Sequence, residues 1–181
     1  GWKAAQPEPV QAWLDAHGFQ AAPGAPLALP GADGRPSAYL AGLSDVADPL
    51  ALAHLPSLLP PGTYRLDPAS PAPVAADLAL LGWGLGAYRF DRYLKPTRAP
   101  ARLVLERADA DASEAFALLK ASTLVRDLVN TPTEHMGPEE LEAAAVRVAQ
   151  ANGAQVRSVV GDALLEQNFP TIHAVGRASH R

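Results

Sequence analysis

The distribution of proline limits what this chain can fold into more than any other feature of its sequence. Fifteen of the 18 prolines lie in residues 1–100, and only three lie in residues 101–181. A proline inside a helix removes a backbone hydrogen bond and clashes with the preceding turn, and inside a sheet it removes a ladder bond. Residues 1–100 are therefore predicted to form mostly short elements, and long uninterrupted helices are expected after residue 100.

The first part of the chain alternates short helices with short strands. A helix is predicted from Glu8 to His17, because Val10, Trp13 and Leu14 recur at helical spacing and Gly18 follows. The other elements predicted here are strands at 27–29 and 37–43 around a turn at 31–34, a short helix at 49–58, a strand at 63–66, a helix within the apolar stretch 73–93, and a strand at 101–106.

The second part opens with a long helix. It is predicted to begin at Asp111, because Asp111 and Glu114 have the spacing of a capping box, and to end at 130–132, where proline follows Asn-Thr. A second helix is predicted from 136–138 to a glycine cap at 152–153. The elements predicted after it are a strand at 155–160, a short helix at 162–167, and a strand or packed turn at 171–176.

This order of elements predicts an α/β protein. Residues 1–106 form a mixed-sheet amino-terminal domain, and a connecting helix occupies 107–136. Residues 137–181 contain the opening of a βαβ-like unit. We therefore place a domain boundary along the connecting helix.

Charge and composition exclude several classes of protein. The net charge is −4, and neither residues 1–100 (7 basic, 8 acidic) nor residues 101–181 (8 basic, 11 acidic) carry the basic surplus that binding to a phosphate backbone requires. A nucleic-acid partner is thus disfavoured, although a local basic patch stays open. The absence of cysteine excludes disulfides, thiolate zinc sites and a cysteine nucleophile within these residues.

Targeting signals are also missing from the sequence. No apolar run approaches the roughly 20 residues of a membrane span, and the start lacks the pattern of a signal peptide. We therefore predict a soluble, cytoplasmic protein with no membrane partner. The chain starts at Gly1 without methionine and stops at Arg181 soon after an apolar stretch, and we interpret both ends as cuts.

A glycine triplet is the first candidate for a binding site. Gly82, Gly84 and Gly86 form GxGxG rather than the dinucleotide-binding GxGxxG, and they lie inside a predicted helix rather than between a strand and a helix. Close packing of that helix explains them better than phosphate binding.

Carboxylates and histidines provide the other candidates. Asp109, Asp111 and Glu114 fit the first turn of a helix better than a metal cluster. The pairs at 134–135 (Glu-His) and 139–140 (Glu-Glu) lack the second histidine of H-E-x-x-H. Four isolated histidines, His17, His54, His173 and His180, are interpreted as surface or hydrogen-bonded side chains, and Ser44 and Ser122 lack the G-x-S-x-G context of a serine hydrolase. We therefore assign no catalytic, cofactor-binding or metal-binding residue to this sequence.

Three stretches nevertheless resemble the leucyl (cytosol) aminopeptidase family. Residues 124–132 (LVRDLVNTP) and 136–141 (MGPEEL) are similar to the family pattern R-x-L-V-N-T-P … M-x-P-x-x-L, which joins its two domains. Residues 86–93 (GAYRFDRY) are similar to G-x-Y-x-F-D-x-Y-K. Residues 174–179 (AVGRAS) match V-G-x-G-S more weakly, because Ala178 replaces the glycine.

The resemblance implies a function that these residues do not carry themselves. Family members are usually assembled as hexamers, and they remove amino-terminal residues from peptides with two divalent metal ions, zinc or manganese. Their metal ligands lie in motifs like V-G-K-G-x-x-F-D-S-G-G and N-T-D-A-E-G-R, and neither motif occurs here. The resemblance thus implies that residues 137–181 begin a truncated catalytic domain, and that the chain is inactive by itself.

Two alternatives stay open beside the enzyme hypothesis. The chain could act as an interaction or oligomerisation module, with DNA binding disfavoured by its charge. Residues 1–106 could also bind a small molecule, although the glycine pattern gives no support for a ligand.

Overall fold

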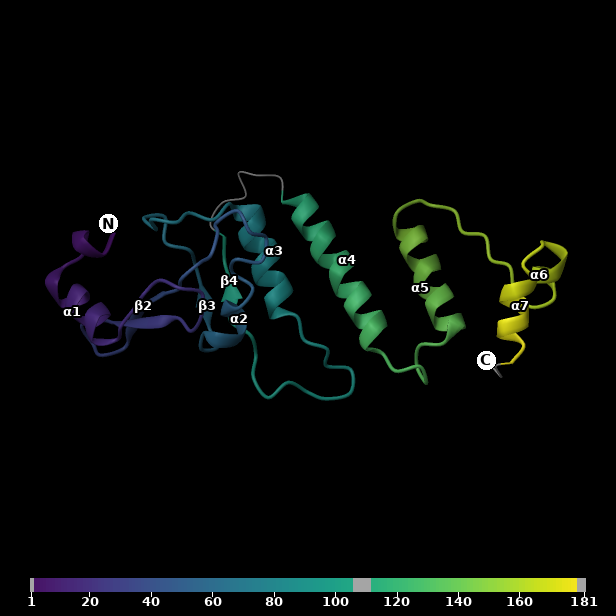
Figure 1. The fold of residues 1–181 in the computed structure, drawn as a ribbon, viewed down its shortest axis with the longest axis horizontal. Helices are drawn as coiled ribbons and strands as arrows, with labels where there is room; N and C mark the ends of the chain where they lie inside the picture. Colours follow the sequence, from purple (N-terminus) through teal and green to yellow (C-terminus); the bar gives the residue numbers. More distant parts are fainter. Residues whose placement is uncertain (1, 106–111, 179–181) are drawn as a thin grey trace. The chain divides into compact units, whose positions relative to one another are not determined.

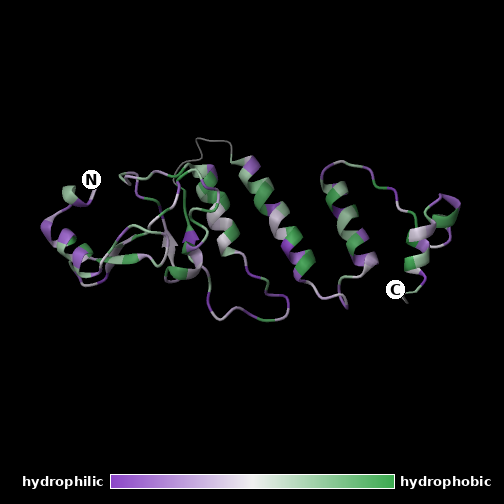
Figure 2. Ribbon diagram, viewed as in Figure 1, coloured by the Kyte–Doolittle hydropathy of each residue, from purple (hydrophilic) through white to green (hydrophobic). Residues whose placement is uncertain are grey.

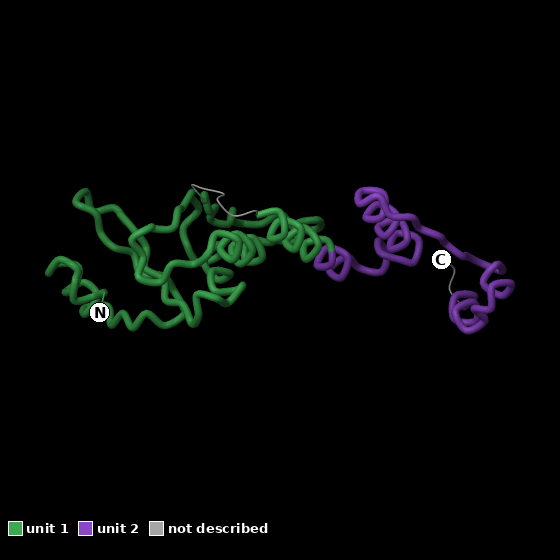
Figure 3. Tube along the Cα trace, turned by 90° about the horizontal axis from the view of Figure 1, so that it is seen from above, with its two compact units in different colours: residues 1–124 green, residues 125–181 purple. Residues whose placement is uncertain are grey.

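The computed structural model describes residues 2–105 and 112–178. The chain divides into two compact units, residues 1–124 and 125–181 (Figure 3). The α/β assignment is confirmed (Figure 1). The elements of the described residues are η1 (Trp2–Ala5), α1 (Glu8–Ala16), β1 (Leu27–Pro30), β2 (Pro36–Leu40), α2 (Leu55–Leu58), β3 (Thr63–Tyr64), α3 (Ala76–Ala87), β4 (Arg102–Leu103), α4 (Ser113–Asn130), α5 (Pro138–Ala151), α6 (Ala163–Glu166) and α7 (Pro170–Gly176).

Strands β1 and β2 form an antiparallel hairpin, with Leu27 paired to Leu40 at its open end. The turn between them contains Gly34 at φ 77°, a backbone conformation that glycine adopts without strain. Helix α1 is tied to the hairpin because the Trp13 indole donates a hydrogen bond of 2.9 Å to the Ala28 carbonyl. The predicted strand at 37–43 is wrong at its end, since pairing stops at Leu40 where β1 begins.

Strands β3 and β4 form a parallel pair, and α3 lies in the connection between them. The pairing is short: Thr63 lies beside Arg102, and Tyr64 beside Leu103. Two backbone bonds of 2.8 Å, from the Arg102 amide to Gly62 and from the Val104 amide to Tyr64, hold the pair together. The predicted strands at these positions are therefore confirmed, although each is shorter than expected.

The predicted helix at 49–58 is wrong over most of its length, because only Leu55–Leu58 is α-helical. Residues 48–55 form successive four-residue turns instead, such as the turn closed by the hydrogen bond from the Ala53 amide to the Leu50 carbonyl. The side chain of Asp48 accepts a hydrogen bond of 2.8 Å from the Leu50 amide. Such local bonds from aspartate compete with helical pairing.

The hydrophobic core of unit 1 (residues 1–124) lies between α2, α3 and β4. Its buried members are Leu52, Leu55, Leu59, Ala79, Trp83 and Ala101. The Trp83 indole donates a hydrogen bond of 2.9 Å to the carbonyl of Ala101, so the polar edge of this large side chain is satisfied inside the core. Tyr39 and Tyr64 pack against this cluster, with their rings 5.7 Å apart in an edge-to-face arrangement.

Helix α4 ends at Asn130, as predicted from the proline at 132. Its end is capped by Thr131, whose hydroxyl donates a hydrogen bond of 2.7 Å to the Asp127 carbonyl. The predicted capping box at the start of this helix includes Asp111, which lies outside the described residues. In α5 the Glu140 carboxylate accepts a hydrogen bond of 2.8 Å from the Gly137 amide, as in a capping box.

Two predictions in unit 2 (residues 125–181) are wrong, the strand at 155–160 and the strand or packed turn at 171–176. Residues 155–160 have no regular structure, and residues 170–176 form the helix α7. A strand needs a neighbour, and no described residue pairs with 155–160. Pro170 occupies the first turn of α7, where proline is compatible with a helix, after Asn168 reverses the chain at φ 64°.

Amide exchange in 155–160 is expected to be fast. Within the described part of the chain, none of these six amides donates a backbone hydrogen bond. We expect them to exchange at nearly the rate of an unstructured peptide, while amides in the middle of α5 exchange much more slowly. Hydrogen exchange of the 181-residue chain, followed by mass spectrometry, checks this. Strong protection across 155–160 would show that the segment has a pairing partner.

Unit 2 has little interior. Among its described residues only Thr131 and Ala144 are buried. Figure 2 shows hydrophobic residues distributed along α5 and α7. Several large apolar side chains of unit 2 are exposed, including Val129 and Val175 at 77% each. Exposed apolar surface on this scale is typical of a surface that contacts other protein. No helix of the described residues is long and apolar enough to cross a membrane.

Candidate functional site

The glycine triplet is a packing device. A β-carbon on Gly82 would lie 2.6 Å from the Pro49 carbonyl oxygen, and one on Gly86 would overlap the carbonyl of Ala53. A β-carbon on Gly84 would approach the side chain of Leu119 in α4 to 2.5 Å. All three glycines lie inside α3. The interpretation that they permit close helix packing is confirmed.

The acidic candidates are divided among different places in the fold. Asp109 and Asp111 lie outside the described residues, and Glu114 is in the first turn of α4. Glu140 caps α5, so that its carboxylate is occupied by the Gly137 amide. Glu139 is exposed in the same first turn, where an acid favours the positive end of the helix dipole.

The histidine candidates also lie apart. The imidazole of His173 lies 3.1 Å from the Asp162 carboxylate, and this pair stands alone. His17 contacts the ring and carbonyl of Trp13. His54 has a buried Nε2 without a hydrogen-bond partner among the described residues. Across residues 2–105 and 112–178, no three histidine, aspartate or glutamate side chains converge as metal ligands would.

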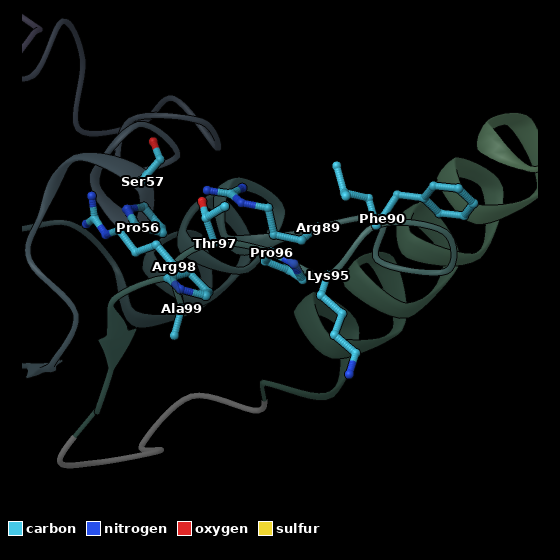
Figure 4. Close-up of a pocket in the computed structure, with 11 residues that line it drawn as sticks. Pro56, Ser57, Arg89, Phe90, Lys95, Pro96, Thr97, Arg98 and Ala99 are labelled. Carbon is cyan, nitrogen blue, oxygen red and sulfur yellow. The ribbon is translucent and has the colours of Figure 1, made fainter.

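One concave surface that gathers polar and charged side chains lies within residues 2–105 of unit 1 (Figure 4). We call it the proline hollow, a cavity of about 360 Å³ between the start of α2 and the segment 89–100. Its lining residues are Pro56, Ser57, Arg89, Phe90, Leu94, Lys95, Pro96, Thr97, Arg98, Ala99 and Pro100. Three of these side chains are cationic and none is a carboxylate.

Backbone contacts hold the walls of the proline hollow in place. The Ala101 amide donates a hydrogen bond of 3.0 Å to the Pro56 carbonyl, which joins the end of the segment 89–100 to α2. At the other end, the Arg89 guanidinium donates to the carbonyls of Gly86 (3.2 Å) and Tyr88 (2.8 Å). Arg89 thereby caps the carboxyl end of α3, where a cation is favourable.

Arg98 also acts on a neighbouring tyrosine. Burial raises the pKa of the Tyr64 hydroxyl, Tyr39 raises it further, and the Arg98 guanidinium lowers it. The Tyr64 hydroxyl donates a hydrogen bond of 2.9 Å to the Pro60 carbonyl. The positive charge of Arg98 therefore acts on the Tyr64 hydroxyl at the edge of the core as well as in the proline hollow.

A loss of stability at alkaline pH follows from Tyr64. Since its pKa is raised by folding, the unfolded chain ionises first, at about pH 10. Its contribution to stability is complete below that pH and is lost as the pH rises through the folded pKa. We expect Tyr64→Phe to weaken the fall in urea stability between pH 8 and pH 11. Tyr93→Phe, at a 49% exposed position, serves as the control, and an equal effect of both variants would contradict the assignment.

The sequence contained a signal for the proline hollow that spacing rules for active sites do not use. Arg89, Arg92, Lys95 and Arg98 recur at every third residue in a segment that carries one acid, Asp91. Proline at 96 and 100 prevents this segment from forming a helix or central strand. The spacing does not place all four cations together, however, because Arg92 lies over the Tyr93 ring, 5.5 Å from its centroid, and does not line the hollow.

Family models match almost the whole chain. Residues 1–106 match the amino-terminal domain of M17 aminopeptidases, and residues 123–181 match the catalytic domain of the cytosol aminopeptidase family. Peptidase B of Cronobacter sakazakii is 43% identical over 76 residues, which are 40% of this chain and 18% of that protein. A probable cytosol aminopeptidase of Corynebacterium glutamicum is 32% identical over 111 residues, which are 57% of this chain and 22% of that protein.

Two solved structures are similar to the whole fold. A cytosol aminopeptidase from Coxiella burnetii gives a TM-score of 0.84 at 34% identity, covering 99% of this chain and 39% of that one. The bottromycin maturation enzyme BotP, in complex with Mn, gives a TM-score of 0.72 at 30% identity, covering 94% of this chain and 40% of that one. The chain thus spans less than half the length of each of these relatives.

Proposed function

The chain belongs to the cytosol aminopeptidase family, M17, and on that premise we propose that it is the amino-terminal, non-catalytic part of a two-metal exopeptidase of the leucyl-aminopeptidase type. One observation carries the proposal: the two family models match in succession, first the amino-terminal domain and then the start of the catalytic domain. The division into residues 1–106, 107–136 and 137–181 is part of the proposal. Peptides are its proposed substrates, and the cytoplasm its proposed location.

The metal chemistry is assigned to residues outside this chain. The described residues do not fit a two-metal site, since no three carboxylates or histidines converge. Asp162, at the start of α6, and His173, in α7, would provide two metal ligands. Among the described residues no third histidine, aspartate or glutamate side chain joins them. We therefore propose that the divalent ions, zinc or manganese, are held by the remainder of the catalytic domain. The Mn of BotP supports manganese as one of the two candidates.

The exposed apolar side chains of unit 2 support a scaffolding role. Val129, Val160 and Val175 are between 68% and 77% exposed, although such residues are normally buried in a folded domain. We propose that the rest of a catalytic domain packs on this surface. Assembly of the whole protein into a homo-oligomer, a hexamer by resemblance to the family, is the second part of this role.

The 181-residue chain is expected to hydrolyse no leucine amide substrate, with or without added manganese or zinc. The physical reason is that the described residues provide no site at which a metal could activate water. Release of p-nitroaniline from leucine p-nitroanilide measures the activity. The positive control is the same chain extended by a complete M17 catalytic domain, which is expected to be active.

Two outcomes would contradict the proposal in different ways. Turnover by the pure 181-residue chain would mean that catalytic groups lie within it. An inactive extended protein, shown to be folded and loaded with metal, would mean that the chain is an interaction module rather than part of an enzyme.

A further inference from the structure

The proline hollow has the composition of a small-molecule site rather than of a protein interface. Six of its eleven lining residues are apolar, including Pro56, Pro96 and Pro100, and the other five are polar or charged. A volume of about 360 Å³ is in the range of sites for small ligands. A ligand that fits it therefore has a compact apolar body.

The positive charge of the hollow indicates that the ligand also carries a negatively charged group. Arg89, Lys95 and Arg98 line the hollow, and no carboxylate lines it to neutralise them. Within the described part of the chain, Lys95 has no ion pair or hydrogen bond, and Arg98 has neither, acting only electrostatically on Tyr64. Other cations nearby are engaged: Arg102 donates to the Thr63 hydroxyl at 3.3 Å. The hollow is thus a place of uncompensated positive charge.

The directions of the side chains distinguish the three cations. In Figure 4 the Arg89 side chain extends toward Thr97, and Arg98 lies on the side of Pro56 and Ser57. Lys95 points away from these groups. In this view the guanidinium groups of Arg89 and Arg98 lie toward the other lining residues, and Lys95 adds a third positive charge to the lining. Planar guanidinium groups match the oxygen pairs of carboxylates and phosphates.

The site is largely formed in advance. Pro56 is fully buried, and its carbonyl accepts the hydrogen bond from the Ala101 amide that closes the segment 89–100. Arg89 is held at the end of α3 by two bonds to carbonyls and keeps its remaining guanidinium donors for a ligand. A site whose walls and cation are already positioned loses less conformational entropy when a ligand binds.

We propose that the proline hollow binds a small organic oxyanion, a phosphate or carboxylate attached to a compact apolar group. The apolar group packs against the proline side chains, and the oxyanion is bound by Arg98 and Arg89 with the hydroxyl of Thr97. Binding at this site does not require peptide hydrolysis. The proposal therefore holds whether or not the chain is part of a peptidase.

Binding is tested by titrating the 181-residue chain with phenyl phosphate and following amide signals by ¹H–¹⁵N NMR. We expect saturable shifts centred on Ser57, Thr97 and Arg98. Inorganic phosphate is expected to bind at least about tenfold more weakly, because it lacks the apolar group. Benzyl alcohol, which lacks the charge, is expected to give no saturable shift. Equal affinities for phenyl phosphate and inorganic phosphate would reduce the site to simple charge attraction and overturn the proposal.

Matched variants locate the site. Arg98→Gln is expected to weaken phenyl phosphate binding about tenfold or more. Arg35→Gln removes the same charge from the exposed β1–β2 turn and is expected to leave the affinity unchanged. Ala99→Leu fills the hollow from an exposed position and keeps every charge, so it is expected to block binding without unfolding the chain.

Three further outcomes would overturn the proposal. Equal weakening by Arg35→Gln and Arg98→Gln, or full affinity in Ala99→Leu, would overturn the proposal. Tighter binding of a hexaglutamate peptide than of phenyl phosphate would also overturn it, by indicating an acidic protein partner. A variant spectrum that matches the parent away from the hollow confirms that folding is retained.

Discussion

Trp83→Ala is expected to lower the free energy of unfolding of unit 1 by about 3–5 kcal/mol, the range for truncating a buried tryptophan. Trp83 is 5% exposed and lies in the core with Leu52, Leu55 and Ala79. Its removal leaves a cavity among these residues and also takes the indole donor from the Ala101 carbonyl. Since Ala101 is 1% exposed, that carbonyl has little access to water as a replacement.

Urea denaturation followed by circular dichroism measures this effect, and two further variants separate its causes. Trp83→Phe keeps most of the volume but loses the hydrogen bond, and it is expected to cost about 1–3 kcal/mol. Phe116→Ala truncates an aromatic residue that is 52% exposed, and it is expected to cost much less than Trp83→Ala. Equal losses for Phe116→Ala and Trp83→Ala would show that the core is not centred where the structure places it.

Gly86→Ala is expected to be the second most destabilising change, with a cost of about 2–3 kcal/mol from overpacking. The added methyl group would overlap the backbone carbonyl of Ala53, which cannot turn away as a flexible side chain could. Helix α3 must then move off the turns at 48–55, and the contact that buries Leu52 loosens. In most helices the same substitution stabilises, because alanine has the higher helix propensity.

Gly62→Ala provides the matched control for this variant. The nearest atom to its added methyl group is 3.5 Å away, on the Tyr64 ring, which is ordinary contact. We expect its urea midpoint to stay close to that of the parent. A stabilised Gly86→Ala variant would mean that α3 is not packed against the 48–55 turns.

The elements that could be predicted from the sequence are those that local chemistry specifies. Helix α1 follows from its apolar spacing and the glycine after it, and α5 follows from its proline and acids at the start and its glycine end. The packing role of the glycines in α3 could be predicted because GxGxG inside a helix lacks the strand-to-helix context of a phosphate-binding loop. In each case the residues that decide the outcome lie within a few positions of the element.

The wrong predictions concern segments whose structure depends on residues far away in the sequence. Whether residues 155–160 form a strand depends on a pairing partner, and none lies in the described residues. The helix predicted at 49–58 is only four residues long. The Asp48 carboxylate accepts a hydrogen bond from the Leu50 amide, and Gly82 and Gly86 of α3 pack directly against the backbone of the 48–55 turns. The proline hollow could not be predicted because it joins α2 to a segment more than thirty residues later in the chain. Neither stretch signals the other in sequence.

The parallel pair β3–β4 has a consequence for the order in which the chain acquires its structure. The hairpin β1–β2 is complete once Leu40 has left the ribosome, since its partners are close in sequence. By contrast, β3 waits for Arg102, and non-local pairing of this kind forms more slowly. The segment 89–100 is closed only by the bonds at Ala101 and Arg102. In a nascent chain the cationic loop therefore stays open until Arg102 has been made, and the hollow forms only then.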